Sequence, residues 1–498
     1  MTQQYKHALV LNPYIKESSA AMGFFPPTGL EYVATAMEGF INRISLIDLR
    51  QEKRLQNIEA LLKFIEDEDI DLICVSCNWS YYFKEVIALI NRMPSHIGLI
   101  VGGQQATDYV EELFKLCPNI RIIVRGEGEE SMQDILNGIP LNEIQGISYK
   151  ENGKDSRIIH NPARPLTDID NLHYPNRRLR RTSYYLKSKN IILSNSGFDT
   201  VLTARGCPFS CKFCTFNLNP LGQKRTYSAR KPESIIEELK TTDAKLIFMA
   251  DDNFFVNPKR VMEICDLIVQ EKIDKRFVAH ARLEIAKHPM MLERAYEAGF
   301  RVMLMGIESP HDRILNMFNK GFTRSEIERS FDVLRNYPFY YHGYFIYGNI
   351  SETEEEMLFI PEFADKIGLD SISAQKLRLE KYSSMKELIE ETPGYYYNTT
   401  GFVYSDTCSI DKLSEIGKKI KKRFYTSKRL IKIVKKLSTT GIFTKGDLKF
   451  FLLRLPMLVT KTIAREFDKK TGKLRKRFRK YLPQRRYGLP EVDMRKKI

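Results

Sequence analysis

The chain has 498 residues, a formal net charge of +16 and eight cysteines. This length is typical of two or three domains, and eight scattered cysteines are not the dense framework of a secreted disulfide protein. No apolar run approaches the ~20 residues that a membrane-spanning helix needs. No signal peptide precedes the first apolar strand either, so we expect an intracellular, cytoplasmic protein.

The first part of the chain, residues 6–140, alternates short apolar strands with helical patterns. This alternation predicts a doubly wound α/β domain with a parallel sheet, in which ligands bind at the carboxyl ends of the strands. The G-x-G-x-x-G fingerprint of a dinucleotide-binding domain does not follow the first strand. The predicted strands are HALVLNP, ISLIDL, LICVSC, LIVGG and IRIIVRGEGEE, and helices such as TGLEYVATAME, KEVIALINRM and DYVEELFKL lie between them.

Two cysteines, Cys74 and Cys77, lie in the predicted strand LICVSC, and no second cysteine pair accompanies them. A structural zinc site needs four ligands, so we interpret these two as core residues rather than metal ligands.

A connector and a second strand–helix repeat follow. The run ISYKENGKDSRII predicts a hairpin around Asn-Gly. From about residue 195 to 380, six further strands alternate with helices: FDTVLTA, KLIFMADDN, RFVAHARLE, RVMLMGIES, YHGYFIYGN and DSISAQKLR. We divide the chain into residues 1–140, a connector 141–190, a core 191–380, and a C-terminal helical region 381–498 with a basic tail from 411.

Three cysteines, Cys207, Cys211 and Cys214, stand together in the run ARGCPFSCKFCTFN. Their C-x3-C-x2-C spacing supplies three thiolates to one loop and leaves one iron of a [4Fe–4S] cube open to another ligand. A closed zinc site would need a fourth ligand, and His173 and His280 are too far along the chain to supply it. Three buried structural cysteines are the other interpretation, and such tight clustering argues against it.

This cysteine motif, with Phe213 directly before Cys214, resembles the signature of the radical S-adenosylmethionine (SAM) enzymes. The resemblance implies a cluster whose open iron is chelated by SAM. One electron, delivered by an external donor such as flavodoxin or ferredoxin, then cleaves SAM to methionine and a 5′-deoxyadenosyl radical, which abstracts a hydrogen atom. The resemblance also implies a partial (β/α)6 barrel, with the active site at the carboxyl ends of its strands. It identifies no further catalytic side chain.

The resemblance also implies SAM contacts at successive strand ends. Polar residues at the end of the second strand of the core would contact the SAM amino group. The next strand end would supply a guanidinium for the SAM carboxylate, and the fourth a carboxylate for the ribose. Residues of the fifth strand would pack against adenine. The predicted set is Asp251, Asp252, Asn253, Arg282, Glu308, Gly343, Ile346 and Gly348. Taken alone, any one of these residues could instead be a helix cap or a loop charge.

The N-terminal domain resembles the cobalamin-binding domain that precedes the radical SAM domain in one large subfamily. The resemblance rests on Pro26-Pro27-Thr28-Gly29-Leu30, Val101-Gly102-Gly103 and the RGEGEE segment. It implies cobalamin as a cofactor, because glycines at strand ends let a ligand approach the backbone closely. The cobalamin contacts that it implies are Ser76, Gly102, Gly103, Arg125, Gly126, Glu127, Gly128 and Glu129.

One departure from the cobalamin pattern concerns the metal. Many cobalamin proteins carry D-x-H-x-x-G after the second strand, and the histidine ligates cobalt. Here the stretch is Asp48-Leu49-Arg50-Gln51-Glu52-Lys53, with arginine in place of histidine. Arginine stays protonated and cannot coordinate a metal. We therefore expect cobalamin without a histidine lower ligand, and a domain without cobalamin is the alternative.

The positive charge is confined to the tail. Residues 411–498 contain 29 Lys and Arg against 7 Asp and Glu, whereas the remainder is slightly acidic. Ile420, Phe424 and Ile431 lie four and seven positions apart among basic residues, which predicts a basic amphipathic helix. The apolar run that follows is too short to span a membrane, and Pro456 would kink it. Such segments lie in the plane of a bilayer interface.

The sequence leaves three interpretations of the basic tail. A membrane surface is favoured, which would make the protein peripheral on the inner face of the membrane. A plain helical cap and a nucleic acid are the alternatives. Large aliphatic residues argue against nucleic acid, because base stacking uses aromatic side chains; they are Leu452, Leu453, Leu455, Leu458 and Val459.

Together these features predict a cobalamin-dependent radical SAM methyltransferase that acts on an unactivated carbon of a lipid, similar to hopanoid methylases. A cyclase or carbon–carbon bond-forming enzyme acting on a lipid or porphyrin is the alternative. RNA modification is less favoured, because Cys74, Cys77 and Cys117 do not fit the additional N-terminal cluster of methylthiotransferases. The sequence does not identify the substrate or the oligomeric state.

Overall fold

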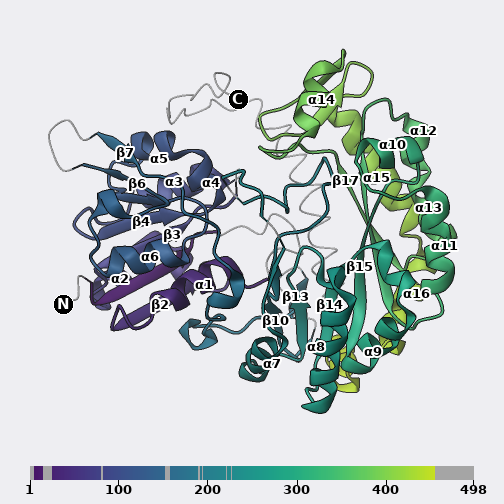
Figure 1. Ribbon diagram of the computed structural model, residues 1–498, viewed down its shortest axis with the longest axis horizontal. Coiled ribbons are helices and arrows are strands. Elements are labelled where there is room, and N and C mark those ends of the chain that lie inside the picture. Colours follow the sequence, from purple (N-terminus) through teal and green to yellow (C-terminus); the bar gives the residue numbers. More distant parts are fainter. Residues whose placement is uncertain are drawn as a thin grey trace, which may run out of the picture.

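The computed structural model describes residues 5–14, 25–79, 82–151, 157–188, 191–192, 194–219, 221–225 and 227–454. These residues form two α/β units, which Figure 1 shows as two lobes. Each unit is built on its own sheet of mainly or wholly parallel strands. No helix within the described ranges is long and apolar enough to cross a bilayer.

The first unit contains a seven-stranded sheet in the order β2-β1-β3-β4-β5-β6-β7 (Figure 1). Strands β1 to β5 pair in parallel, and β6 and β7 continue the sheet as an antiparallel hairpin. The hairpin predicted in the connector therefore belongs to this sheet. The strands are β1 (His7–Asn12), β2 (Arg43–Asp48), β3 (Leu72–Ser76), β4 (Gly98–Gly102), β5 (Ile122–Val124), β6 (Ile147–Lys150) and β7 (Ile158–His160).

Helices cover both faces of this sheet, which explains the continuous apolar runs of its strands. Alternate residues of β1 point to opposite faces: Ala8 and Val10 join one core cluster, Leu9 and Leu11 the other. Cys74 and Cys77 lie in these cores, as predicted, and burial raises the pKa of both thiols to about 12. The helices are α1 (Thr28–Ala36) and α6 (Glu129–Leu136) on one face, and α2 (Ile58–Asp67), α3 (Phe83–Ile90) and α5 (Val110–Leu116) on the other, with the short α4 (Gln104–Asp108) after β4.

The second unit is a parallel six-stranded sheet in the order β10-β13-β14-β15-β16-β17 (Figure 1). All six predicted strands are present. The outer strands do not pair with each other, so the barrel is partial, as expected. The strands are β10 (Phe198–Val201), β13 (Leu246–Met249), β14 (Arg276–Ala281), β15 (Phe300–Glu308), β16 (Tyr340–Tyr347) and β17 (Ser371–Lys376).

Helices pack on the outer face of the second sheet, and smaller elements complete the unit. The outer helices are α7 (Pro232–Thr241), α8 (Pro258–Gln270), α9 (Pro289–Ala298), α10 (Asp312–Met317), α11 (Arg324–Leu334), α12 (Glu354–Leu358), α13 (Ile360–Lys366) and α15 (Ile410–Phe424). The smaller elements are the strand pairs β8 (Lys187–Ser188) with β9 (Ile191–Ile192), β11 (Ala204–Arg205) with β12 (Ser228–Ala229), and β18 (Tyr395–Tyr397) with β19 (Val403–Ser405), together with α14 (Met385–Glu391).

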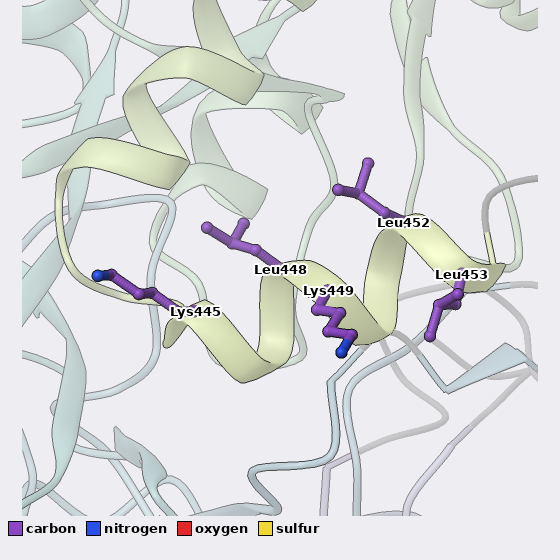
Figure 2. A pocket seen from close by; sticks show the side chains of 5 residues that line it. All are labelled: Lys445, Leu448, Lys449, Leu452 and Leu453. Carbon is purple, nitrogen blue, oxygen red and sulfur yellow. The ribbon is translucent and has the colours of Figure 1, made fainter.

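The start of the basic tail is part of the barrel, which corrects the tail prediction. Ile420 and Phe424 of α15 are buried in the main core, so this apolar face packs on the protein. Two further helices follow: α16 (Ser427–Thr439) and a helix over 445–454, which Figure 2 shows from close by. The predicted features beyond residue 454, including Pro456, lie outside the described residues.

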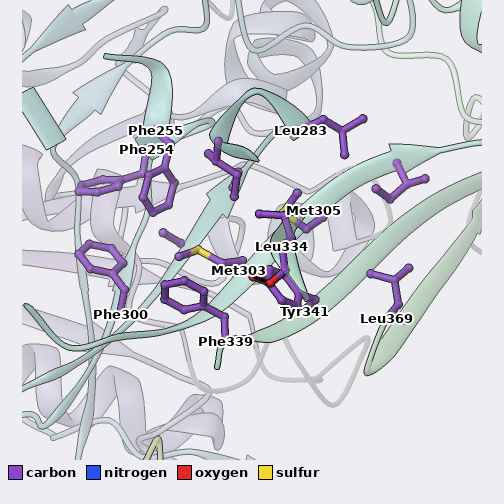
Figure 3. Close-up of a cluster of buried hydrophobic side chains, with 14 of the residues drawn as sticks. Phe254, Phe255, Leu283, Phe300, Met303, Met305, Leu334, Phe339, Tyr341 and Leu369 are labelled. Carbon is purple, nitrogen blue, oxygen red and sulfur yellow. Dashed lines mark hydrogen bonds between the residues drawn. The ribbon is translucent and has the colours of Figure 1, made fainter. Parts of the chain in front are cut away.

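Aromatic and sulfur-containing side chains fill the space between the second sheet and its helices (Figure 3). The rings of Phe254 and Phe277 each lie 5.0 Å from that of Phe300, centroid to centroid. Met303 and Met305 alternate with inward-facing residues along β15 and are fully buried. This packed outer face leaves the opposite, inner face of the sheet to carry the chemistry.

Candidate functional site: a cysteine loop and two facing sheet edges

The three motif cysteines lie in the loop between β11 and β12. Cys207, Cys211 and Cys214 are all free and partly buried. Neighbouring segments hold the loop by its backbone: Lys212 N–H donates to the Phe318 carbonyl over 3.0 Å, and the Ser383 hydroxyl donates to the Lys212 carbonyl over 2.7 Å. The loop is therefore anchored at its centre, between the first and third cysteines.

The surroundings of the thiols suit an anionic sulfur cluster. The Arg282 guanidinium lies 3.4 Å from the Cys211 Sγ atom and stacks on the Phe209 ring, 3.8 Å from its centroid. Burial raises the pKa of Cys214 to about 12, so the thiol has to lose its proton when it binds metal. Three thiols in one loop match the donor set of a cube with one open iron.

The described residues contain no group of three or more His, Cys, Asp or Glu side chains arranged to hold one metal ion. This finding fits the cysteine loop, because each thiolate of a cube binds a different iron.

The predicted SAM residues at the end of β13 divide into two roles. Asp251 accepts hydrogen bonds from the backbone N–H groups of Thr203 and Ala204, at 2.6 and 3.1 Å, and from the Thr203 hydroxyl. Its carboxylate is buried and used by these contacts, so the structure assigns it to positioning the strand that leads into the cysteine loop. Burial and the charge of Asp251 raise the pKa of Asp252 to about 7. Asn253 Oδ1 is buried and has no partner among the described residues, which leaves an acceptor for a bound donor.

Glu308, predicted to bind ribose, forms a buried ion pair that the sequence did not reveal. Its Oε1 atom lies 3.2 Å from the Lys320 Nζ atom. The backbone of Glu308 has φ of +67°, which is rare for a residue with a side chain. A Cβ atom at Gly306 would lie 2.7 Å from the same Oε1 atom, so the glycine leaves room for the carboxylate.

Two of the three residues predicted to contact adenine face the helices. A Cβ atom at Gly343 would lie 2.4 Å from Leu369, and one at Gly348 would lie 2.8 Å from Leu413 of α15. The structure therefore assigns both glycines to close packing of the sheet on its outer layer. Ile346 lies on the other face of β16, because successive strand residues alternate.

The inner face of the sheet carries a polar group that sequence reasoning missed. His342 makes hydrogen bonds with the hydroxyls of Ser371 and Ser373, at 2.7 and 3.1 Å. The Tyr344 ring lies between the two imidazoles, with centroids 5.9 Å from His280 and 4.9 Å from His342. Burial lowers the pKa of both histidines to about 4, so both rings are neutral at pH 7. The available signal was the alternation along RFVAHARLE and YHGYFIYGN, in which each histidine lies on the face opposite the fully buried residues.

In the first unit, the predicted cobalamin residues lie at the carboxyl ends of β3 and β4. Asn78 Nδ2 donates to the Ser76 hydroxyl over 2.7 Å. Gly103 has φ of +107°, and a Cβ atom there would lie 2.4 Å from Asn78 Oδ1, so only glycine fits. Gly102 ends β4 beside it. Gln105 Oε1 is buried without a partner in the described part of the chain. A ligand can therefore approach the backbone closely at this edge and donate a hydrogen bond to Gln105 Oε1. Both features fit an amide-rich ligand such as cobalamin.

Arg50, which replaces the cobalt-ligating histidine, makes hydrogen bonds within the protein. Its Nε and Nη2 atoms donate to the Asp48 carboxylate at 3.1 and 2.7 Å, and Nη2 also donates to the Phe25 carbonyl. The Tyr184 hydroxyl of the connector donates to the same carboxylate over 2.8 Å. The position that holds the metal ligand in many cobalamin proteins is here occupied by an arginine that binds Asp48, the carboxylate that anchors the connector.

The RGEGEE segment lies against the cysteine loop. Glu129 accepts from Arg205 over 2.5 Å, and Glu127 pairs with both Arg205 and Arg225. Arg205 is separated from Cys207 by one glycine. Two carboxylates predicted to bind cobalamin therefore bridge the two units and bring the strand ends of the first sheet next to the cysteine loop.

The other members of that segment act within the first unit. Arg125 Nη2 donates to the carbonyls of Ile147 and Asn161, and Gly126 N–H donates to the Thr107 hydroxyl over 3.0 Å. A Cβ atom at Gly128 would lie 3.3 Å from Val33 of α1. These residues shape the loop rather than offer side chains to a ligand.

The fold and the cysteine loop define a radical SAM enzyme that carries a B12-type domain. The radical SAM superfamily matches residues 201–364, and the B12 binding domain matches residues 19–136. An uncharacterized methyltransferase of Pyrococcus horikoshii is 30% identical over 355 residues, which cover 69% of this chain and 74% of that protein. The chain belongs to the B12-binding radical SAM family, whose cofactors are a [4Fe–4S] cluster, SAM and cobalamin.

Two further similarities are more distant. The hopanoid C-3 methylase of Methylococcus capsulatus is 26% identical over 325 residues, or 62% of this chain and 58% of that protein. The structure of the radical SAM methyltransferase TsrM from Kitasatospora setae, with cobalamin and a [4Fe–4S] cluster bound, superposes with a TM-score of 0.61 at 17% identity. That superposition covers 79% of this chain and 77% of TsrM, and it shows the shared fold.

The single tryptophan of the chain gives a direct test of cobalamin binding. Trp79 follows Asn78 at the edge of the first sheet and is 38% exposed. We expect hydroxocobalamin to quench its fluorescence, because the corrin ring absorbs light in the range where tryptophan emits. Titration with hydroxocobalamin measures the quenching, with free N-acetyltryptophanamide as the correction for absorbed light. Quenching no greater than that of the free amide would contradict binding at this edge, and Trp79→Phe should remove the signal while the bound corrin still absorbs.

Proposed function

We propose that the protein is a cobalamin-dependent methyltransferase that acts on an unactivated carbon of a lipid-like substrate. The observation that carries the proposal is the contact of Glu127 and Glu129 with Arg205. It brings the ligand-binding edge of the first sheet to the start of the cysteine loop, so that two cofactors can serve one substrate. When bound, the cluster supplies the electron that cleaves SAM, and cobalamin supplies the methyl group.

The residues of the chain position the reactants. The Arg282 guanidinium lies 3.4 Å from the Cys211 Sγ atom, and it would neutralise negative charge at the cluster or pair with the SAM carboxylate. The buried acceptor Asn253 Oδ1 would take a hydrogen bond from the SAM amino group. The neutral ring of His280 would orient a polar group of the substrate without adding charge. Such positioning limits where the reactive carbon can lie.

A lipid-like substrate is supported by two observations. The hopanoid C-3 methylase, an enzyme named for the methylation of a lipid, is among the relatives. The C-terminal helices of this chain also present exposed aliphatic residues beside lysines. The polar inner face of the barrel favours a lipid that carries a hydrogen-bonding group over a plain hydrocarbon.

The test is a labelling experiment with the anaerobically reconstituted protein, a reductant, a lipid extract and SAM with a deuterated methyl group. We expect 5′-deoxyadenosine, S-adenosylhomocysteine and a deuterated methyl group on a lipid, all read by mass spectrometry. Formation of 5′-deoxyadenosine with an unlabelled product would instead indicate the cyclase or carbon–carbon bond-forming reaction. Label recovered in added RNA would overturn the lipid assignment.

A further inference from the structure

A row of aliphatic side chains is exposed on α16. Leu430, Ile431 and Val434 are 50%, 70% and 59% exposed. At about 100° per residue, these three positions lie within an arc of about 100° on one side of the helix. Exposure of several adjacent aliphatic residues costs free energy, so a row of this kind indicates a surface that contacts a partner.

The same helix is held firmly by its other apolar residues. Ile433 and Leu437 pack on a cluster formed by the amino ends of the barrel strands, which includes Phe198 and Tyr340. Farther along the chain, Asp447 accepts from the hydroxyls of Ser194 and Ser196, which fixes the start of the helix over 445–454. The exposed row is therefore presented by an anchored scaffold.

Unpaired lysines accompany this row. Helix α16 has five basic residues and no acidic residue, and only Arg429 has an ion pair within 4.0 Å among the described residues, with Asp365. Lys428, Lys432 and Lys435 flank the exposed row on the side of Ile431, because each lies within about 100° of that position around the helix.

The helix over 445–454 also carries exposed aliphatic residues together with lysines. Figure 2 shows its lysines and leucines, which line one pocket. Leu452 and Leu453 are 62% and 73% exposed, and Lys445 and Lys449 lie between the leucines around the helix. Two consecutive helices thus combine exposed aliphatic residues with unpaired cations.

We propose that these two helices form a surface that docks on the interface of an anionic bilayer. The docking surface consists of Leu430, Ile431, Val434, Leu452 and Leu453 with Lys428, Lys432, Lys435, Lys445 and Lys449. Anionic headgroups complement the unpaired lysines, and the aliphatic rows enter the boundary between headgroups and acyl chains. Long lysine side chains reach back to the headgroups while aliphatic residues insert.

A bilayer fits this surface better than a nucleic acid does. The large apolar residues exposed on the docking surface are leucine, isoleucine and valine. Binding of single-stranded nucleic acid relies on aromatic stacking, which aliphatic side chains do not provide. The docking surface lies on helices that cap the amino ends of the barrel strands, away from the cysteine loop, so its binding does not depend on methyl transfer.

The test measures binding of the full-length chain to vesicles by co-flotation. We expect binding to phosphatidylcholine vesicles that contain phosphatidylglycerol, weaker binding to phosphatidylcholine alone, and loss of binding at high salt. Two triple variants should each weaken binding roughly tenfold or more, because they remove separate contributions to the same contact. They are Leu430→Ser with Ile431→Ser and Val434→Ser, and Lys428→Glu with Lys432→Glu and Lys435→Glu.

The matched controls make the same kinds of substitution at exposed positions outside the docking surface. Met290 on α9 is 70% exposed, so Met290→Ser removes an exposed apolar side chain outside the docking surface. A triple change of Lys259, Lys272 and Lys287 to Glu alters the net charge equally, and both controls should bind as the unaltered chain does. Both docking-surface variants should also unfold at the same denaturant concentration as the unaltered chain, because the changed side chains are exposed.

Two results would overturn the proposal. Unchanged vesicle binding by both docking-surface variants would place membrane contact in residues 455–498 or elsewhere. Tight, salt-sensitive binding to an RNA oligonucleotide without any preference for anionic vesicles would identify nucleic acid as the partner. Failure of the labelling experiment would leave this result unaffected, since vesicle binding is measured without SAM.

Discussion

Replacing Cys207, Cys211 or Cys214 with serine will abolish both cluster binding and SAM cleavage. The three cysteines are the only ones in the loop between β11 and β12, so no neighbouring thiol can take over a lost iron ligand. Serine keeps the size of the side chain but replaces the soft thiolate that iron–sulfur clusters require. We expect less than one cluster for every ten chains and no measurable 5′-deoxyadenosine, compared with near-stoichiometric iron and sulfide in the unaltered protein.

The measurements are iron and sulfide content after anaerobic reconstitution, the absorbance of the cluster, and 5′-deoxyadenosine formed from SAM. Cys408→Ser is the matched control, because Cys408 is also partly buried but lies outside the loop, after β19. Full cluster content in any of the three loop variants would contradict the assignment of that cysteine as a ligand.

Replacing Arg180 with alanine will strongly reduce the stability of the joined units. Arg180 of the connector donates to Glu31 of the first unit at 2.6 and 2.7 Å, and to Asp199 of the second at 2.9 Å. All three side chains are nearly buried. Loss of one partner from a buried ion pair leaves an uncompensated charge, which typically costs about 3–5 kcal/mol.

The adjacent Arg181 supplies the control for this second prediction. Its side chain is 43% exposed and its nearest carboxylate, on Glu52, lies 3.3 Å away. Arg181→Ala should therefore cost no more than about 1 kcal/mol. Chemical unfolding followed by circular dichroism compares the two variants, and equal shifts in the unfolding midpoint would show that the buried chain of charges does not hold the units together.

The two units were predictable because their apolar patterns are local. All eleven strands predicted for the two α/β repeats are present, since each is a short run of buried residues bounded by polar or glycine residues. The cysteine loop was equally visible, because its spacing is contained within eight consecutive residues. The assignment of Cys74 and Cys77 to the core is confirmed for the same reason.

The contacts across the site were not predictable, because they join residues far apart in the chain. Glu127 and Glu129 stay predicted cobalamin contacts, and their pairing with Arg205 of the other unit was not visible in the sequence. Gly343 and Gly348 were expected beside adenine, and they pack on the helices. Lys320, the buried partner of Glu308, carried no signal in the sequence.

The basic tail shows the same limit. Its amphipathic period was visible, but a helix with an apolar face packs equally well on a protein core or on a membrane. The structure buries Ile420 and Phe424 of α15 and leaves Ile431 of α16 exposed. The residues predicted to form one amphipathic face therefore serve two purposes. Those of α15 pack on the barrel, and Ile431 of α16 belongs to the proposed docking surface.

By itself, the sequence of this protein determined the cluster motif, the two α/β repeats and the missing histidine of the cobalamin pattern, because each is written in a short stretch. Only the tertiary structure decided what Arg50 does instead, which carboxylates join the two units, and which polar residues line the inner face of the barrel. Those features depend on contacts between strand ends that the fold brings together. The cysteine motif therefore identifies the chemistry, and the fold decides which residues surround it.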